Sequence, residues 1–214
     1  MSRSIAIIVL LGFPLQAEII DRIAASVDYR VITTSEVERQ IRVAAFEDGQ
    51  KPDLSAARKQ AALQTMIDQV LIQKDLENSH YPLPEPAELN PAIDQFKKEH
   101  FPSDAEYRRV LAEYGITEQD FRDLLLWQRT LLSFIQVRFE TGIQISDQEI
   151  SDYFEKTVKP AAEAAHPGQA VTLDDYRKQI QKTLEGQQVD RQMDTWLNAA
   201  RRRARILIHE EALQ

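Results

Sequence analysis

The segment DRIAASVDYRVITTSEVERQIRVAAF, Asp21 to Phe46, decides the fold. Two β-branched, apolar runs, Ile23 to Val27 and Arg30 to Thr33, flank the tight connection Asp28-Tyr29 and predict a β-hairpin. An amphipathic helix is predicted to follow directly. Because an isolated hairpin is not stable in water, a further strand or a helix face must cover it.

The predicted helix is preceded by residues suited to capping its first turn. Thr33 and Ser35 each carry a hydroxyl and are each followed three residues later by a glutamate, Glu36 and Glu38. This spacing predicts two overlapping capping boxes. The missing strand is predicted at the other end of the chain, where Ala204 to His209 (ARILIH) alternates as a strand does. The sequence therefore predicts that the two ends of the mature chain lie side by side in one sheet.

Composition favours a mostly helical globular protein. Of 214 residues, 43% are hydrophobic and 28% are charged, and only 6 are glycine and 9 proline. There is no cysteine, so disulfides and thiol chemistry cannot contribute. The predicted fold class is mostly α. It consists of a bundle of about six to seven helices and a small antiparallel sheet formed by the N-terminal hairpin and the C-terminal strand.

Apolar spacing and capping residues divide the rest of the chain into helices. The predicted helices after the first cover 54–78, 88–100, 103–114, 118–141, 146–158 and 173–203. Ser103 with Glu106 and Ser146 with Glu149 have capping-box spacing, and Gly115 is placed to end a helix. A linker is predicted over 159–172. A kink or break is expected at Gly186, where the apolar phase slips.

The first 17 residues have the features of a secretory signal peptide. Arg3 precedes an apolar stretch from Ile5 to Leu15, and Ala17 provides the small residue before cleavage. The apolar stretch is shorter than the ~20 residues that a membrane span needs. We therefore expect an exported protein with no stable membrane insertion. The mature chain would carry 25 basic and 34 acidic residues, a net charge of 25 − 34 = −9.

This acidic balance argues against nucleic acid as a partner. Arg201 to Arg203 and Arg205 form the main basic cluster, and cations at a helix C-terminus complement its dipole. Residues 103–132 have the outline of a helix-turn-helix. The second helix of that pair is acidic and apolar, however, which disfavours phosphate contacts.

Several segments, taken in order, resemble one family of secreted chaperones. They are DRIAASVDYRVITTSEVERQI, QTMIDQVLIQKDLE, AEYRRVLAEYGITEQDFRDLLLWQRTLLSFI, ISDQEISDYFEK and WLNAARRRARILIH. The start IxxxVxxxxITxSEVE is the most specific part. The chain resembles the SurA-like chaperones, which escort unfolded outer-membrane proteins through the periplasm. The resemblance places the N-terminal chaperone domain at 18–158 and the C-terminal helix and strand that complete it at 173–214.

The family normally carries one or two parvulin-type prolyl isomerase domains before the final helix. Here only Glu155 to Thr172 separate the two helical parts, far fewer than the ~100 residues of a typical domain. The resemblance therefore implies a chaperone without its isomerase domain, and no catalytic residue is carried over. No cofactor is expected. His80, His100, His166 and His209 are scattered without metal-ligand spacing, so no metal site is predicted either.

Aromatic and aliphatic residues off the main helical stripes are the remaining candidates for contact with unfolded polypeptides. The predicted client-binding residues are Tyr107, Tyr114, Trp127, Phe134, Val137 and Phe139. For each one, a place in the core is the alternative. The predicted groove lies between helices 104–141 and helices 54–78 and 173–203. Two other functions stay open: an adaptor that docks to one folded envelope partner, and a homodimer that exchanges its C-terminal segment.

Overall fold

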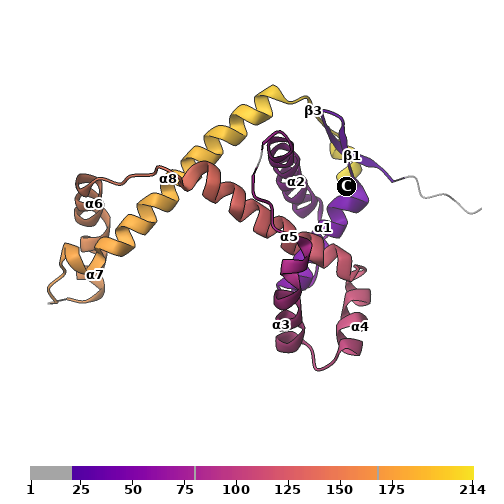
Figure 1. The fold of residues 1–214 in the computed structure, drawn as a ribbon, viewed down its shortest axis with the longest axis horizontal. Coiled ribbons are helices and arrows are strands. Elements are labelled where there is room, and N and C mark those ends of the chain that lie inside the picture. Colours follow the sequence, from indigo (N-terminus) through magenta and orange to yellow (C-terminus); the bar gives the residue numbers. More distant parts are fainter. Residues whose placement is uncertain (1–20, 80, 168) are drawn as a thin grey trace, which may run out of the picture.

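The computed structural model describes residues 21–79, 81–167 and 169–214. The predicted signal peptide and its cleavage position lie outside these residues. The described chain is mostly helical with one small antiparallel sheet, which confirms the predicted fold class (Figure 1). The elements in order are β1 (Ile23–Val27), β2 (Arg30–Thr33), α1 (Thr34–Glu47), α2 (Ala56–Glu77), η1 (Pro86–Leu89), α3 (Asn90–His100), α4 (Asp104–Tyr114), α5 (Glu118–Ile135), η2 (Gln136–Glu140), α6 (Asp147–Tyr153), η3 (Phe154–Val158), α7 (Lys159–Ala165), α8 (Leu173–Arg203), β3 (Ile206–Ile208) and η4 (Glu210–Leu213).

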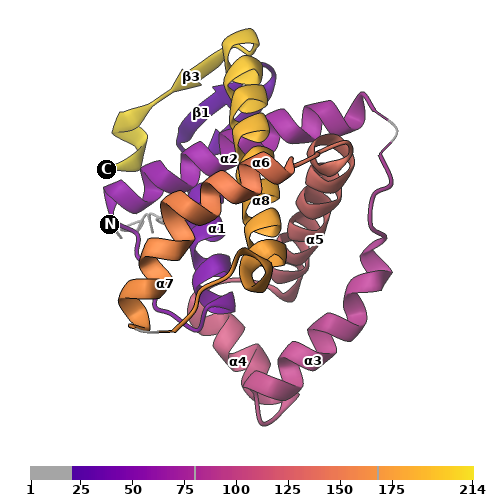
Figure 2. The same ribbon diagram turned by 90° about the vertical axis from the view of Figure 1, so that its left-hand side faces the viewer.

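The sheet joins the two ends of the described chain, as predicted. Its strand order is β2-β1-β3, and β3 pairs antiparallel with β1 so that Val27 faces Ile206 and Ala25 faces Ile208. Figure 2 shows that β3 and β1, which are far apart in the sequence, lie side by side. Ala25 and Val27 are buried against α1 and α2, so the helices cover the inner face of the sheet.

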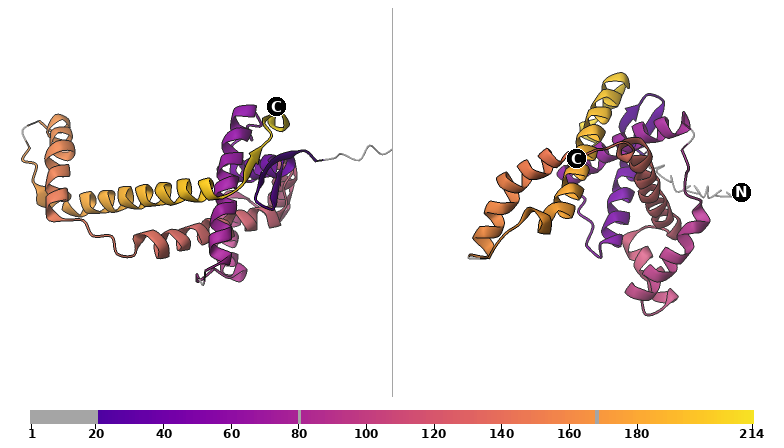
Figure 3. Two further views of the ribbon diagram at one scale, coloured as in Figure 1. Left: turned by 90° about the horizontal axis from the view of Figure 1, so that it is seen from above. Right: turned by 60° about the vertical axis from the view of Figure 1, so that its left-hand side comes forward.

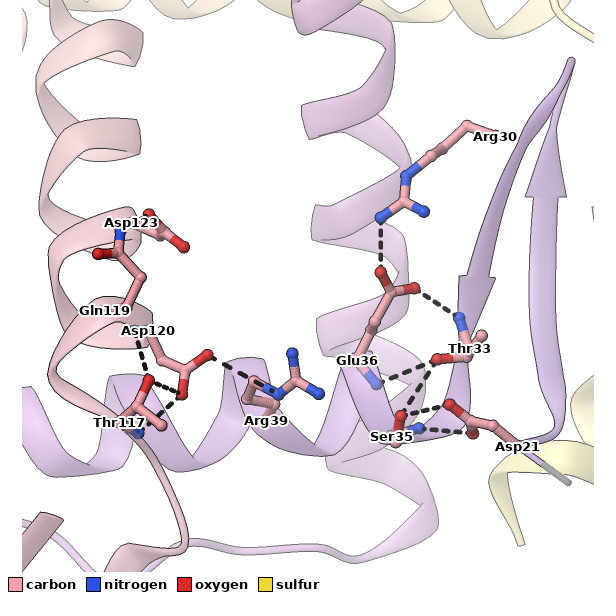
Figure 4. A network of polar contacts seen from close by, with 10 residues as sticks. All are labelled: Asp21, Arg30, Thr33, Ser35, Glu36, Arg39, Thr117, Gln119, Asp120 and Asp123. Atoms are coloured by element: carbon pink, nitrogen blue, oxygen red, sulfur yellow. Dashed lines mark hydrogen bonds and ion pairs between the residues drawn. The ribbon is translucent and has the colours of Figure 1, made fainter. Parts of the chain in front are cut away.

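One of the two predicted capping boxes at the start of α1 is present. The Thr33 hydroxyl accepts from the Glu36 N–H, and the Glu36 carboxylate accepts from the Thr33 N–H at 2.9 Å (Figure 4). The second box was wrong. The Ser35 hydroxyl instead donates to Asp21, and Glu38 pairs with Arg42. Because α1 begins at Thr34, Ser35 already lies inside the helix and cannot cap it.

Two further predicted boxes have different outcomes. At the start of α6, Ser146 and Glu149 form a complete capping box. At the start of α4, Ser103 accepts from the Glu106 N–H, but the Glu106 carboxylate binds Arg109 instead of returning to Ser103. Only half of that box forms, because an arginine one turn away competes for the carboxylate.

Buried side chains form four apolar clusters along the chain. The sheet core joins β1, β2, α1 and α2. The aromatic core joins the end of α1 with η1, α3, α4 and the start of α5. The middle core joins the end of α2, the end of α5, η2 and the middle of α8. The distal core joins α6, η3 and the start of α8. Figure 3 shows α8 running from the distal elements past α5 to the sheet.

The expected break at Gly186 was wrong, since α8 is one uninterrupted helix over 31 residues. The slip in apolar phase has another cause. Leu184 packs on the distal core and Val189 packs on the middle core, so the helix changes partners at Gly186. An added Cβ at Gly186 would meet nothing within 4 Å, so the glycine lies in open space.

The predicted linker is shorter than expected, because α7 continues the helical path to Ala165. Alanine has the highest helix propensity, and a proline is tolerated in the first turn, where Pro160 lies. The small residues of this stretch therefore form a helix. Figure 1 places α6 and α7 at one end of α8 and the sheet at the other, so the molecule has a main body and a distal lobe. We define the distal lobe as α6, η3, α7 and α8 up to Leu184.

Candidate functional site

Five of the six predicted client-binding residues lie in two different cores. Tyr107 is fully buried in the aromatic core, and Tyr114 is half-buried beside it. Phe134 and Phe139 are buried in the middle core, where Trp127 packs half-buried. Val137 is the most exposed of the six, at 43%. The structure therefore brings these residues to no common surface, and only Val137, Trp127 and Tyr114 retain accessible area.

Tyr107 illustrates why a tyrosine in this region is a packing residue. Burial raises the pKa of its hydroxyl to about 12. That hydroxyl has no hydrogen-bond partner among the described residues. The ammonium of Lys97 lies 4.5 Å from the ring centre, which is a cation–π distance. The ring is enclosed by other aromatic side chains, so a client cannot reach it in this conformation.

Trp196 on α8 is a half-buried residue at the edge of the middle core. Its ring packs 5.3 Å from that of Phe134, and the guanidinium of Arg138 lies 5.2 Å from its centre. Arg138 also donates to the carboxylate of Asp75 at 3.1 Å and to the hydroxyl of Tyr81 at 3.0 Å. These contacts hold a half-buried indole between α5, η2 and α8.

Trp196 lines two surface cavities. The larger, about 830 Å³, lies between η2, the start of α6 and α8. We call it the α8 groove, and its lining residues are Arg138, Phe139, Glu149, Gln188, Arg191, Gln192, Thr195, Trp196 and Ala199. The smaller, about 150 Å³, lies between α2 and the end of α8. The larger cavity includes η2 and α8, two of the predicted walls, together with α6, which was not predicted as a wall. The smaller cavity contains no residue of 104–141 and therefore differs from the predicted groove.

The lining of the α8 groove combines ring faces with polar groups. The ring of Trp196 and Ala199 offer apolar area, whereas the glutamines and Thr195 offer donors and acceptors. Ser146 N–H and hydroxyl hydrogen bonds lower the pKa of Glu149, which keeps that carboxylate charged. Such a surface suits a polypeptide backbone and its side chains together.

Exposed aliphatic side chains also lie on α5 and η2. Leu132 is 67% exposed and Val137 43% exposed, one helical turn or so apart on α5 and η2. The hydroxyl of Ser133 donates to the carbonyl of Pro82, so the segment with the exposed Leu83 lies beside the same part of α5. Sequence spacing identified Val137, but it did not separate Leu132 from the buried members of the helix.

A polar cleft between α1 and α5 has a structural role. The guanidinium of Arg39 lies 3.8 Å from the Asp120 carboxylate and connects the two helices (Figure 4). The other Asp120 oxygen accepts from the N–H of Thr117 at 2.7 Å and caps α5. Glu36 is engaged by Arg30 and Thr33. These carboxylates are already satisfied by caps and ion pairs.

The described residues show neither a cluster of metal-ligand side chains nor a helix able to cross a membrane. Nowhere in 21–79, 81–167 or 169–214 do three or more histidine or acidic side chains gather as metal ligands would. Over the same residues, no helix combines the length and the apolar character that a membrane span requires.

The fold and the groove define a class of protein: a helical module whose two ends meet in one small sheet and whose final helix carries an open amphipathic groove. The family model described as the SurA-like N-terminal domain matches residues 4–133. The chain therefore belongs to the SurA-like N-terminal domain family. This agrees with the resemblance found in the sequence. Among curated proteins, no match was found.

Proposed function

We propose that this protein is an ATP-independent periplasmic chaperone that binds unfolded outer-membrane proteins along the α8 groove. Membership of the SurA-like family supports a chaperone-like role. The observation that carries the proposal is Trp196, a half-buried indole that lines the cavities on both sides of α8.

The chemistry of the groove suits weak and unspecific binding. Apolar contact with the ring of Trp196 and with Ala199 would tolerate many client side chains, since burial of apolar area is non-directional. Gln188 and Gln192 can hydrogen-bond an extended backbone whatever its sequence. A chaperone without ATP needs contacts of this kind, because each must be released without energy input.

The proposal includes the absence of prolyl isomerase activity and of any catalytic residue or cofactor. It is supported by the short connection between η3 and α8, which runs through α7 and leaves no room for a further domain. Export to the periplasm is part of the same proposal and rests on the composition of residues 1–17.

The test is suppression of aggregation. An outer-membrane β-barrel protein unfolded in urea is diluted into buffer with the mature chain, and light scattering is followed with time. We expect a molar excess of the chain to reduce scattering strongly without accelerating prolyl isomerisation of a peptide substrate. Unchanged aggregation would contradict the chaperone function.

A matched pair of variants tests the groove itself. Thr195→Arg places a long charged side chain in the groove from an exposed position. Asn198→Arg adds the same charge to an exposed position of α8 that does not line the groove. We expect Thr195→Arg to weaken suppression of aggregation and Asn198→Arg to leave it unchanged. Equal effects of the two variants would contradict binding of clients in the α8 groove.

The outer face of the sheet favours a second candidate function, an adaptor that docks to one folded partner. Tyr29 at the hairpin tip is fully exposed, and Val31 and Leu207 are exposed at 36% and 47% on the two edge strands. Pull-down from an envelope extract separates the two functions. Many unfolded β-barrel precursors would support the chaperone, and one folded stoichiometric partner would support the adaptor. Light scattering of the purified chain tests the exchanged homodimer.

A further inference from the structure

A further cavity lies in the main body, at the C-terminal end of α1. Its volume is about 240 Å³, and its lining residues are Phe46, Glu47, Asp48, Gly49, Phe96, His100, Phe101, Val110 and Tyr114. We call it the α1-end cavity. It is smaller than the ~300–1,000 Å³ typical of sites for drug-sized molecules, so it suits one side chain rather than a cofactor.

Aromatic rings dominate this cavity. Phe46 is buried, and its ring centre lies 5.9 Å from that of Phe101 and 5.5 Å from that of Tyr114. Phe96 lies 5.7 Å from Phe46 and packs against the imidazole of His100 at 4.5 Å. A ligand in the cavity would therefore meet several ring surfaces at once. A cation within about 6 Å of such a ring centre is attracted by the electrons of its face.

The charges around the cavity also favour a cation. Glu47 and Asp48 line it, and no lysine or arginine does so among the described residues. The Glu47 carboxylate accepts from the amide of Gln128 at 2.9 Å, a neutral partner that leaves its charge in place. α1 ends here, and the C-terminal end of a helix carries partial negative charge.

The wall formed by residues 48–50 is held in place. The hydroxyl of Tyr114 donates to the carbonyl of Gln50 at 2.9 Å, which ties the segment after α1 to the end of α4. Gly49 has a φ of +63°, a left-handed conformation, and a Cβ added there would meet nothing within 4 Å. The cavity is therefore preformed and accessible from this side.

We propose that the α1-end cavity binds the positively charged side chain of a lysine or arginine in an extended polypeptide. The rings would contact its methylene groups and its charge, and Asp48 and Glu47 would neutralise that charge. As a statement about clients, this inference rests on the proposed chaperone function and adds a preference for basic segments. As a statement about binding, it is tested independently of that function.

The experiment is an NMR titration of the whole mature chain with labelled phenylalanine, tyrosine and valine. The probes are three unstructured glycine–serine peptides that differ only in one central residue: lysine, glutamine or leucine. We expect the lysine peptide to shift the signals of Phe101, Tyr114 and Val110 in a saturable way. The glutamine and leucine peptides should shift them much less.

Variants define the contribution of the charge and of the rings. Asp48→Asn should weaken binding of the lysine peptide roughly two- to fivefold, the range expected for the loss of one solvent-exposed ion pair. Glu163→Gln, which makes the same charge change on exposed α7, should leave binding unchanged. Phe101→Leu should weaken binding by a similar factor, and its melting temperature checks that it folds.

Equal shifts with the leucine peptide, no shift with lysine, or an unaltered affinity in Asp48→Asn would overturn the inference. If the chain still suppresses aggregation in that case, the chaperone function stands without it. If the lysine peptide binds as expected but aggregation is not suppressed, the chaperone function is wrong and the binding site remains.

Discussion

At the scale of single residues, Asp28 connects three parts of the chain. It lies in the hairpin turn with a φ of 52°, a left-handed conformation that aspartate tolerates better than most residues. Its carboxylate accepts from the ammonium of Lys74 on α2 at 2.6 Å and from the N–H of Arg205 at 2.9 Å. Its own N–H donates to the carbonyl of Arg205 at 2.8 Å. One turn residue thus holds the hairpin, α2 and the approach to β3.

We expect Asp28→Ala to lower the free energy of unfolding by about 1–2 kcal/mol. Both hydrogen bonds of the carboxylate are lost, and alanine is strained at positive φ. Asp28→Asn should cost less, because asparagine tolerates the conformation and can still accept one hydrogen bond. Urea denaturation measures both. Tyr29→Ala in the same turn, at a fully exposed position, is the control and should change stability by less than about 0.5 kcal/mol.

The same residue should make stability depend on pH. The hydrogen bond from Lys74, and then that from Arg205, hold the pKa of Asp28 below its ordinary 3.8. A carboxyl group with a lowered pKa in the folded state contributes stability above its unfolded pKa and loses it as pH falls through the folded pKa. The difference in unfolding free energy between the wild-type chain and Asp28→Asn should therefore be constant near neutrality and shrink below about pH 3.8. A difference that grows towards low pH would contradict this assignment.

At the scale of elements, the C-terminal strand and turn complete the sheet core. β3 covers one edge of β1, and Leu213 of η4 is 1% exposed within the same core. The Thr34 hydroxyl also donates to the carbonyl of Ala212 at 3.0 Å, which ties η4 to the start of α1. The final residues therefore stabilise the first ones.

Truncation after Arg203 should lower the free energy of unfolding by about 3 kcal/mol or more. It removes a buried leucine and the strand pairing to β1. Thermal unfolding monitored by circular dichroism measures the loss, and deletion of the exposed Gln214 alone is the control. An unchanged melting temperature would contradict a stabilising role for β3 and η4.

Two glycines in or after helices should respond to alanine in opposite ways. Gly186 lies inside α8 in open space, so Gly186→Ala should stabilise the chain by roughly 0.5–1 kcal/mol through helix propensity. Gly115 ends α4 with a φ of 66°, so Gly115→Ala should destabilise by about 1 kcal/mol or more. Urea denaturation of both variants tests the pair. A loss of stability in Gly186→Ala would mean that the glycine serves another purpose in α8.

At the scale of the whole molecule, α8 connects two bodies with separate cores. The distal core around Ile150, Phe154 and Ile180 shares no buried residue with the other three. Figure 3 shows the distal lobe joined to the body by α8 and by the segment before α6. The α8 groove lies at this junction, so the position of the lobe sets the width of the proposed binding surface.

Phe154→Ala should therefore unfold the distal lobe in preference to the body. Truncating a buried phenylalanine lowers the free energy of unfolding by about 3–5 kcal/mol. The distal core has only three buried residues, so this loss is large relative to its stability. Hydrogen exchange should show faster exchange around Ile150 and Ile180, with little change around Leu63 and Ile67 of the sheet core. Uniform acceleration throughout the chain would show that the lobe and the body unfold together.

Local chemistry in the sequence was sufficient for the elements and their ends. The hairpin, the Thr33 and Ser146 capping boxes and the turn at Gly115 depend on a few neighbouring residues, and each was predicted correctly. The return of the C-terminal strand was also predictable, because an uncovered hairpin requires it. The family followed from the order of these elements.

Only the tertiary structure decided which apolar residues are accessible. Phe134 and Leu132 are both apolar residues of α5, and periodicity alone does not tell which of them is buried. Phe134 is fully buried and Leu132 is 67% exposed, because α8 covers one side of α5 and leaves another side open. The same limit applies at Gly186, where α8 stays continuous while its packing partners change. It also applies to Trp196, whose two cavities are formed by η2, α2, α6 and α8. A sequence determines the faces of a helix, whereas the elements packed against it determine which face becomes a surface.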